Sequence, residues 1–188
     1  WVQTASAGVD SLLLGSVPFP EHVVLTNASG VYGAAGAEHI VGMMLYFVRG
    51  FGFYLANQKR GRWVRDVSYA GLLQGKTLVI LGLGDIGTNL ARRARAFDMR
   101  VIGVKRTAGN HPNVERVVGV SELDEVLPLA DHLAITLPLT RETRGLLDAR
   151  RIGLLRPGTY VYNLGRGAIV DEEALVSALQ TGHLGGAG

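Results

Sequence analysis

The 188-residue sequence predicts an α/β protein with a doubly wound parallel β-sheet. Two observations support this prediction. From Gly75 onward, short apolar runs rich in β-branched residues alternate with patterns of helical period, and the connections between them are short. A loop with the spacing G-x-G-x-x-G joins the first of these runs to the first helical pattern.

The composition describes a globular chain and excludes several kinds of function. Hydrophobic residues make up 47% and charged residues 19%, which is enough apolar material to bury a core. Because the sequence has no cysteine, disulfides, thiolate zinc sites and thiol nucleophiles are excluded, and we expect no metal site. The net charge of +3 does not favour nucleic acid as a partner, and the most apolar stretch, Ile40–Val48, is too short to span a membrane. Trp1–Thr4 does not resemble a signal peptide, so we expect a cytoplasmic protein.

The predicted elements follow the hydrophobic pattern in chain order. The first strand is Thr77–Leu81, a continuous apolar run typical of a strand buried on both faces. Asp171 is a good N-cap for the last predicted helix. Between them lie a helix with apolar positions Ile86, Leu90, Ala94 and Phe97, a strand at Arg100–Val104, a weaker strand at Val114–Val118, a short helix opened by a capping box of Ser121 and Asp124 and closed by Pro128, a strand at Leu133–Leu137, a helix within 148–155, and a strand at Thr159–Asn163; the Asp171 helix runs to about Thr181.

The first third of the chain has a different pattern. After a predicted strand at Val23–Thr26, residues 34–59 form a long apolar stretch with weak periodicity. A helix that is apolar nearly all round must be covered on several sides, so we expect it between domains or in a subunit interface. We therefore divide the chain into residues 1–32, part of a second domain, and 33–188, a nucleotide-binding domain that includes this helix.

The glycine loop, residues 82–87, predicts a dinucleotide site of the Rossmann type. It follows a predicted strand and opens a predicted helix, which is the context that gives the pattern its meaning. Gly82 permits the tight turn, Gly84 lets a pyrophosphate approach the backbone, and Gly87 lets the helix pack closely on the strand. The N-terminus of the helix offers free N–H groups to the phosphates.

The end of the second strand indicates which coenzyme binds. An NAD site places an acidic residue there to accept hydrogen bonds from the ribose 2′-hydroxyl, but no acidic residue occurs from Met99 to Val114. Lys105, Arg106 and Thr107 are instead suited to a 2′-phosphate. We therefore predict that NADP(H) is preferred over NAD(H). The alternative is that Lys105 and Arg106 face solvent and the site is indifferent.

Arg166 follows the strand Thr159–Asn163 and is flanked by Gly165 and Gly167. Ligands of open parallel sheets collect at the carboxyl ends of the strands, so this arginine is placed for a substrate. Its guanidinium can hold a carboxylate through two N–H groups and can stabilise the charge that develops on a ketone during hydride transfer. The alternative is an arginine that forms an ordinary surface ion pair.

Together these residues resemble the D-isomer-specific 2-hydroxyacid dehydrogenases. The resemblance runs in family order over essentially the whole chain, through Ser6–Asp10, Ala37–His39, Gly75–Gly87, Leu137–Thr140 with Thr143, and Asn163–Asp171. It implies that 1–32 is a remnant of a flavodoxin-like substrate domain and that the 34–59 helix lies between domains and builds a homodimer. It also implies roles for individual residues: the backbone at Ala7 and Gly8 would hold the substrate carboxylate, Asp85 and Ile86 the pyrophosphate, Leu137, Pro138 and Thr143 the adenosine side of the coenzyme, and Leu164 and Gly165 the nicotinamide, with Arg166 as the substrate-binding arginine.

The sequence departs from the family pattern at two points. Lys105 replaces the acidic residue of the second strand, as in the glyoxylate/hydroxypyruvate reductase-like branch of the family. The family's general-acid histidine, the glutamate beside it and an aspartate that contacts the nicotinamide would all lie beyond Gly188. We therefore expect this chain to be an internal fragment that binds coenzyme but has little or no turnover by itself.

The resemblance implies an oxidoreductase that transfers a hydride between NADP(H) and a small 2-keto or 2-hydroxy carboxylic acid. The sequence leaves glyoxylate, hydroxypyruvate and larger 2-ketoacids open as substrates. A short-chain dehydrogenase is not favoured, because no tyrosine is followed four residues later by lysine. A non-catalytic, corepressor-like module that senses nucleotide and binds partners remains the alternative.

Overall fold

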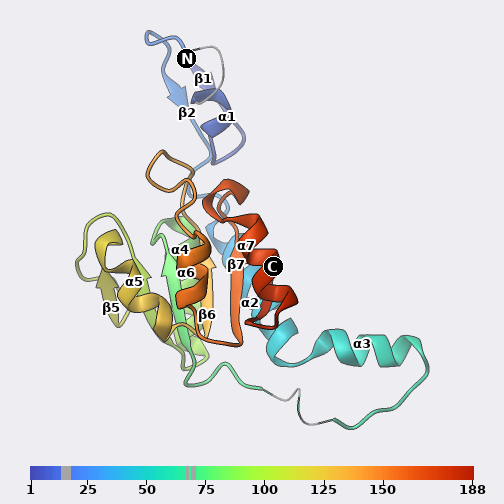
Figure 1. Ribbon diagram of the computed structural model, residues 1–188. Helices are drawn as coiled ribbons and strands as arrows, with labels where there is room; N and C mark the ends of the chain where they lie inside the picture. Colours follow the sequence, from blue (N-terminus) through green and yellow to red (C-terminus); the bar gives the residue numbers. More distant parts are fainter. Residues whose placement is uncertain (14–17, 67, 69–70) are drawn as a thin grey trace.

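The computed structural model describes residues 1–13, 18–66, 68 and 71–188, and in it the predicted doubly wound sheet is confirmed. Six parallel strands lie in the order β5-β4-β3-β6-β7-β8 (Figure 1). Numbered along this domain, that order is 3-2-1-4-5-6, the order of dinucleotide-binding sheets. The strands are β3 (Thr77–Leu81), β4 (Arg100–Val104), β5 (Arg116–Val118), β6 (His132–Ile135), β7 (Thr159–Asn163) and β8 (Leu184–Ala187).

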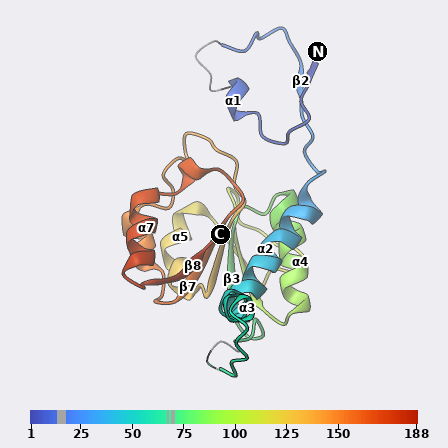
Figure 2. The same cartoon turned by 90° about the vertical axis from the view of Figure 1, so that its right-hand side faces the viewer.

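Helices cover both faces of this sheet (Figure 2). On one face lie α2 (Gly33–Val48) and α4 (Asp85–Ala96), and on the other lie α5 (Leu123–Val126), α6 (Ala149–Leu154) and α7 (Glu172–Gln180). Short 3-10 turns occur at Val120–Glu122, Leu127–Leu129 and Gly167–Ile169.

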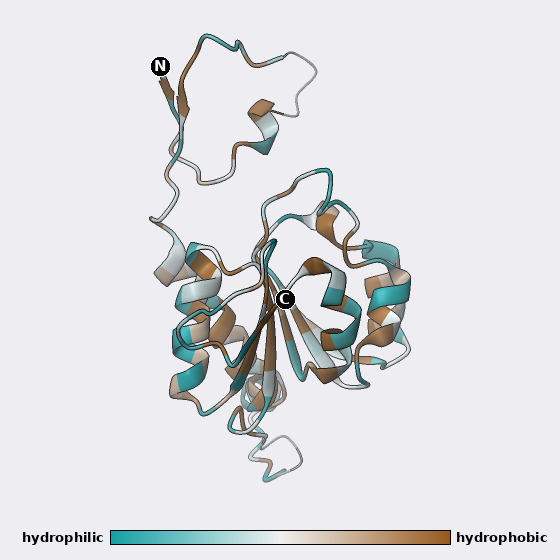
Figure 3. Cartoon of the chain, turned by 90° about the vertical axis from the view of Figure 1, so that its left-hand side faces the viewer, coloured by the Kyte–Doolittle hydropathy of each residue, from teal (hydrophilic) through white to brown (hydrophobic). Residues whose placement is uncertain are grey.

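The sandwich explains why four of the five positions of β3 are apolar. All five of its residues are buried, with Leu78 and Ile80 in the core against α2 and α4 and Val79 and Leu81 in the opposite core. Because successive side chains of a strand point to opposite faces, a strand covered on both sides needs a continuous apolar run and not an alternating one. Hydrophobic residues accordingly concentrate on the strands and on the inner sides of the helices (Figure 3).

Residues 1–32 form a small lobe beside the carboxyl ends of the strands (Figure 1). Two short strands, β1 (Val2–Gln3) and β2 (Leu25–Thr26), pair in parallel, and α1 (Asp10–Leu13) lies between them in the chain. No described residue of this lobe is buried. The strand predicted at Val23–Thr26 is shorter than expected, because β2 includes only Leu25 and Thr26. That this lobe is part of a substrate domain stays a prediction.

The single long helix predicted at 34–59 is wrong, because two helices occupy this segment. α2 ends at Val48 and α3 (Phe51–Lys59) begins after Gly50, whose φ of 62° lies in the left-handed region that ends helices. The two helix axes differ by 68°. α2 is buried at Ala37, Ile40 and Met44, as expected, whereas α3 projects from the body of the domain and buries none of its residues (Figure 1).

No single helix of the described chain is both long and apolar enough to cross a membrane; only α2 and α3 taken together pass that test, and the bend at Gly50 separates them.

Several boundaries also differ from the sequence prediction. β6 is His132–Ile135, so Leu137 follows the strand instead of ending it. The capping interaction lies two residues earlier than predicted, because Glu122 accepts a hydrogen bond from the backbone N–H of Gly119 (3.1 Å). The short helix α5 ends at Val126, just before Pro128 as predicted, and Pro128 itself lies in the 3-10 turn Leu127–Leu129. The edge strand β8 was not predicted, because the glycines within it conceal the strand pattern.

His132 is a polar residue inside the core. It is 1% exposed, its ring stacks beside Tyr160 and Tyr162, and its Nδ1 lies 3.0 Å from the hydroxyl of Tyr162. Burial lowers the pKa of His132 from 6.5 to about 4, against a smaller opposing effect of Asp131. The ring is therefore neutral in the folded protein at pH values where the unfolded chain would bind a proton.

We expect the free energy of unfolding of the domain to decrease as the pH falls, because of His132. The unfolded chain binds more protons than the folded one between the two pKa values, so this contribution is complete above pH 6.5 and is lost as the pH falls toward about 4. The loss amounts to roughly 3 kcal/mol. Denaturant unfolding across this range should show a shallower pH dependence for His132→Gln than for the wild type. Parallel curves for the two proteins would contradict this assignment.

Candidate coenzyme and substrate cleft

The largest part of the predicted site lies where the strand order of the sheet reverses. β3 pairs with β4 on one side and with β6 on the other, so the loop after β3 lies between the loops that follow both neighbours. Clefts at this topological switch point are where doubly wound sheets bind ligands. A cleft of about 710 Å³ occupies this position, between the glycine loop, the loops after β6 and β7, and the 1–32 lobe.

The glycine loop has the geometry that its sequence predicts. Gly82 turns the chain out of β3 with a φ of 100°, and its carbonyl oxygen accepts a hydrogen bond from the hydroxyl of Thr136 (2.7 Å). A Cβ at Gly87 would collide with that same carbonyl oxygen. The first turn of α4 therefore lies directly on the end of β3, which only glycine at position 87 allows.

The N-terminus of α4 is suited to hold a pyrophosphate. No hydrogen bond to the backbone N–H groups of Gly84, Asp85 or Ile86 occurs within the described part of the chain. A Cβ built at Gly84 would meet nothing within 4 Å, so the space beside this backbone is open. Free N–H groups at the positive end of a 12-residue helix, beside an open approach, fit the diphosphate of a dinucleotide.

Lys105, Arg106 and Thr107 follow β4 and do not line the cleft itself. Lys105 is half-buried, while Arg106 and Thr107 are exposed at the same end of the sheet. Arg106 is close enough to Glu142, a residue of the cleft wall, for its charge to help hold the pKa of that carboxyl down, after a larger effect of the Thr140 hydroxyl. The three residues predicted to bind the ribose therefore lie at the carboxyl edge of the sheet, on the opposite side of β3 from the loop after β6.

Leu137 and Pro138 line the cleft, whereas Thr143 is not among its lining residues. The Thr143 hydroxyl donates to the carbonyl oxygen of Pro138 (2.7 Å) and accepts from the backbone N–H of Thr140 (2.8 Å). These two bonds fix the shape of the loop that carries Pro138; that Thr143 contacts the coenzyme stays a prediction.

Arg166 lies in the cleft, on the turn that follows β7. Asn163 stabilises this turn, because its side chain accepts from the Gly165 N–H (3.0 Å) and donates to the Arg166 carbonyl (3.0 Å). The guanidinium donates through Nε to Asp10 of the lobe (3.0 Å), pairs with it through Nη2 (2.9 Å) and donates through Nη1 to the Gly165 carbonyl (2.9 Å). The hydrogen bond from Arg166 holds the pKa of the Asp10 carboxyl below its ordinary value.

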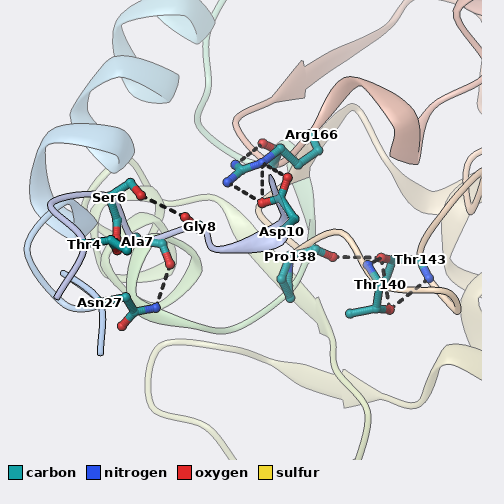
Figure 4. A network of polar contacts seen from close by, with 11 residues as sticks. Thr4, Ser6, Ala7, Gly8, Asp10, Asn27, Pro138, Thr140, Thr143 and Arg166 are labelled. Atoms are coloured by element: carbon teal, nitrogen blue, oxygen red, sulfur yellow. Dashed lines mark hydrogen bonds and ion pairs between the residues drawn. The ribbon is translucent and has the colours of Figure 1, made fainter. Parts of the chain in front are cut away.

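The backbone at Ala7 and Gly8 meets Arg166 across the cleft (Figure 4). Its carbonyls are held by side chains, since Asn27 donates to the Ala7 oxygen (2.7 Å) and Ser6 to the Gly8 oxygen (2.8 Å). The N–H groups of Ala7 and Gly8 have no hydrogen-bond partner among the described residues. A Cβ at Gly8 would collide with the guanidinium of Arg166, so this arginine rests directly on the lobe's backbone.

The cleft brings together nine of the predicted residues. They are Ala7, Gly8, Asp85, Ile86, Leu137, Pro138, Leu164, Gly165 and Arg166. Gly82, Gly84 and Gly87 shape the turn that leads to Asp85 and Ile86 but, like Lys105, Arg106, Thr107 and Thr143, are not among the residues that line the cleft.

Sequence reasoning missed two residues of the site. Asp10 enters the sequence analysis only as the end of the Ser6–Asp10 motif, with no role of its own. Thr136 could have been predicted, because it places a hydroxyl directly after a buried apolar strand. No group of three or more residues suited to hold a metal ion is found over the described residues.

The comparisons with known proteins agree with this geometry. Residues 41–188 match the model of the D-isomer specific 2-hydroxyacid dehydrogenase family, NAD binding domain. The chain belongs to this family.

The relatives also show how much of a family member the chain represents. It is 37% identical to a D-3-phosphoglycerate dehydrogenase from Sus scrofa over 99% of its own length and 35% of that protein's. A family member from Aeromonas salmonicida superposes with a TM-score of 0.91 at 36% identity, covering 100% of this chain and 59% of that one. An NADPH-dependent glyoxylate/hydroxypyruvate reductase from Sinorhizobium meliloti, solved with NADP and sulfate, superposes with a TM-score of 0.87 at 30% identity, covering 99% of this chain and 59% of that one. The chain thus spans about a third of the curated relative and three fifths of the solved ones.

Two glycine variants should separate the two requirements of the loop. Gly84→Ala adds a methyl group to open space, so we expect its free energy of unfolding to stay within about 1 kcal/mol of the wild type while its affinity for NAD(P)H falls about tenfold or more. Gly87→Ala forces the helix off the strand and should cost roughly 1–3 kcal/mol of stability as well.

Denaturant unfolding and a fluorescence titration with NADPH and NADH measure both quantities. Full coenzyme affinity in Gly84→Ala would show that no diphosphate lies against this backbone. Unchanged stability in Gly87→Ala would show that the close contact with β3 is not required.

Proposed function

We propose that the full-length protein carrying this chain reduces a small 2-keto carboxylate to the D-2-hydroxy acid, with NADPH preferred over NADH. The observation that carries the proposal is the meeting, in one cleft, of Arg166, the unpartnered N–H groups of Ala7 and Gly8, and the N-terminus of α4. The first two fit a substrate carboxylate, and the last fits a coenzyme diphosphate.

In this proposal the chain's own residues bind and orient both molecules. The N–H groups of Gly84, Asp85 and Ile86 would hold the diphosphate, and Leu164 and Gly165 would lie beside the reactive ring. When bound, the coenzyme supplies the hydride that the reduction needs. Arg166 would hold the ketoacid with its carbonyl carbon facing that ring and would stabilise the negative charge that develops on the ketone oxygen.

The new alkoxide also needs a proton. No histidine lines the cleft in the ranges that the structure describes. We propose that the proton donor is supplied by a further part of the full-length protein, since the relatives are longer than this chain. The 188 residues alone would then bind coenzyme, but their turnover would be roughly 10²- to 10⁴-fold slower than that of the full-length protein.

The preference for NADPH rests on charge. Lys105 and Arg106 follow β4, and no carboxylate stands between Met99 and Val114 to repel a 2′-phosphate. The relative from Sinorhizobium meliloti, 30% identical, is described as NADPH-dependent.

We also propose that a second copy of the chain covers the exposed apolar residues of α3, which are Phe51, Tyr54 and Leu55. Sedimentation of the full-length protein tests this dimer. A monomer at micromolar concentration would contradict that dimer.

Removing the guanidinium should abolish most of the activity. Arg166→Ala in the full-length protein loses both a carboxylate ligand and the donor facing the ketone oxygen, so kcat/KM for glyoxylate should fall about 10²- to 10³-fold. Arg92→Ala is the matched control, because Arg92 is an exposed arginine of α4 that does not line the cleft. Oxidation of NADPH, followed spectrophotometrically, is the measurement. Equal losses in both variants, or no turnover of any 2-ketoacid by the wild type, would contradict the proposed function.

Reversing the charge after β4 should change the coenzyme preference. Arg106→Asp replaces a donor to the 2′-phosphate with a repelling carboxylate that can accept from a 2′-hydroxyl, so kcat/KM should fall roughly 10- to 100-fold for NADPH and should not fall for NADH. Both constants are measured at saturating glyoxylate. A wild type that favours NADH, or a variant with an unchanged ratio, would contradict the preference.

A further inference from the structure

Asp10 is the residue of the cleft whose role the proposed function leaves unexplained. It is the first residue of α1, on the 1–32 lobe, and it lies 156 positions before Arg166 in the sequence. Its carboxylate accepts from Nε of Arg166 with both oxygens (3.0 and 3.3 Å), and Nη2 lies 2.9 Å from the nearer one. Across the described residues, this pair is the only side-chain hydrogen bond or ion pair that joins the lobe to the nucleotide-binding domain.

The pair uses one particular edge of the guanidinium. An arginine side chain carries five N–H groups in a fixed planar fork. Asp10 engages the edge formed by Nε and Nη2, and the Gly165 carbonyl takes one N–H of Nη1 (2.9 Å). At least one N–H group therefore remains on each terminal nitrogen, so both nitrogens can still donate to a carboxylate.

Acceptors on both sides of the cleft thus fix the plane of the guanidinium. Asp10 lies on the lobe and Gly165 on the turn after β7. Gly8 contributes by its missing side chain, because a Cβ there would collide with Nη2. The guanidinium consequently lies against the backbone of Gly8, in the same loop as the N–H groups of Ala7 and Gly8, which have no partner in the described chain. The two kinds of donor can then converge on one substrate carboxylate.

We propose that Asp10 is a positioning residue for substrate recognition: it fixes the side edge of the Arg166 guanidinium so that the end of the fork and the backbone of Ala7 and Gly8 bind the same carboxylate. This inference rests on the proposed function. The opposite role, in which Asp10 occupies the place of the substrate carboxylate and competes with it, is less compatible with a pair that leaves the end of the fork free.

The first test measures binding of a ketoacid and of an inert dicarboxylate to the full-length protein. Asp10→Asn keeps one acceptor oxygen but loses the charge and the second acceptor. We expect it to raise KM for glyoxylate roughly 10- to 100-fold, with KM for NADPH unchanged. The affinity for oxalate, measured by calorimetry in the presence of NADP, should fall by a similar factor. Glu21→Gln is the matched control, an exposed carboxylate on the same lobe.

The second test asks whether Asp10 acts through Arg166. In a double-mutant cycle with Arg166→Lys, the loss caused by Asp10→Asn should largely disappear, because lysine lacks the fork that Asp10 orients. A purely structural role of Asp10 would give additive losses and would overturn the inference. Tighter glyoxylate and oxalate binding in Asp10→Asn would overturn it in favour of competition.

These outcomes separate the inference from the proposed function. Wild-type turnover combined with unchanged glyoxylate and oxalate binding in Asp10→Asn overturns the inference alone. A wild type that neither reduces glyoxylate nor binds oxalate overturns both. Should Asp10→Asn unfold at a lower denaturant concentration, Asp10→Glu, which keeps the charge on a longer side chain, should restore much of the affinity if positioning is its role.

Discussion

The arrangement of the cleft depends on the close contact between the first turn of α4 and the carboxyl end of β3. Because position 87 has no side chain, the helix lies against the carbonyl oxygen of Gly82, which Thr136 also holds by a hydrogen bond. β3 is central in the sheet and buried throughout, so the position of this turn is fixed from both faces. The free N–H groups of α4 are therefore presented at a defined place, beside the loops after β4 and β6.

A second constraint joins the two parts of the chain. The 1–32 lobe has no buried residue in its described part, so hydrophobic burial contributes little to its position. Arg166 supplies a polar connection, since its guanidinium bonds to Asp10 and rests on Gly8. The residue that is best placed to recognise a substrate is thus also the one that contacts the lobe, and its geometry depends on where the lobe lies.

The sequence predicted those parts of the fold whose causes are local. The buried, mainly apolar run at Thr77–Leu81, the glycine spacing after it and the N-cap at Asp171 each act within a few residues, and all three are found in the structure. The break between α2 and α3 depends on one glycine in the left-handed region, with helical sequence on both sides, and was therefore not located. β8 lacks the side chains that identify a strand, and only pairing with β7 shows it.

The tertiary contacts of the site were outside the reach of sequence patterns. Nothing in the residues near Asp10 indicates that its partner is Arg166, because the two meet only when the lobe lies over the sheet. Thr143 shows the same limit: nothing in its motif indicates that its hydroxyl bonds to the Pro138 carbonyl and the Thr140 N–H.

The charges of the cleft are consistent with anionic ligands even though three carboxylates stand in its wall. Asp85 lies against Gly33 and accepts from the Asn89 amide (3.2 Å), Glu142 is stabilised by the Thr140 hydroxyl and by nearby arginines, and Asp10 is paired with Arg166. Each negative charge therefore has a donor of its own within the protein. The remaining donors are the backbone N–H groups at α4 and at Ala7 and Gly8 and the free N–H groups of Arg166. They have no such partner among the described residues and can serve the proposed diphosphate and carboxylate.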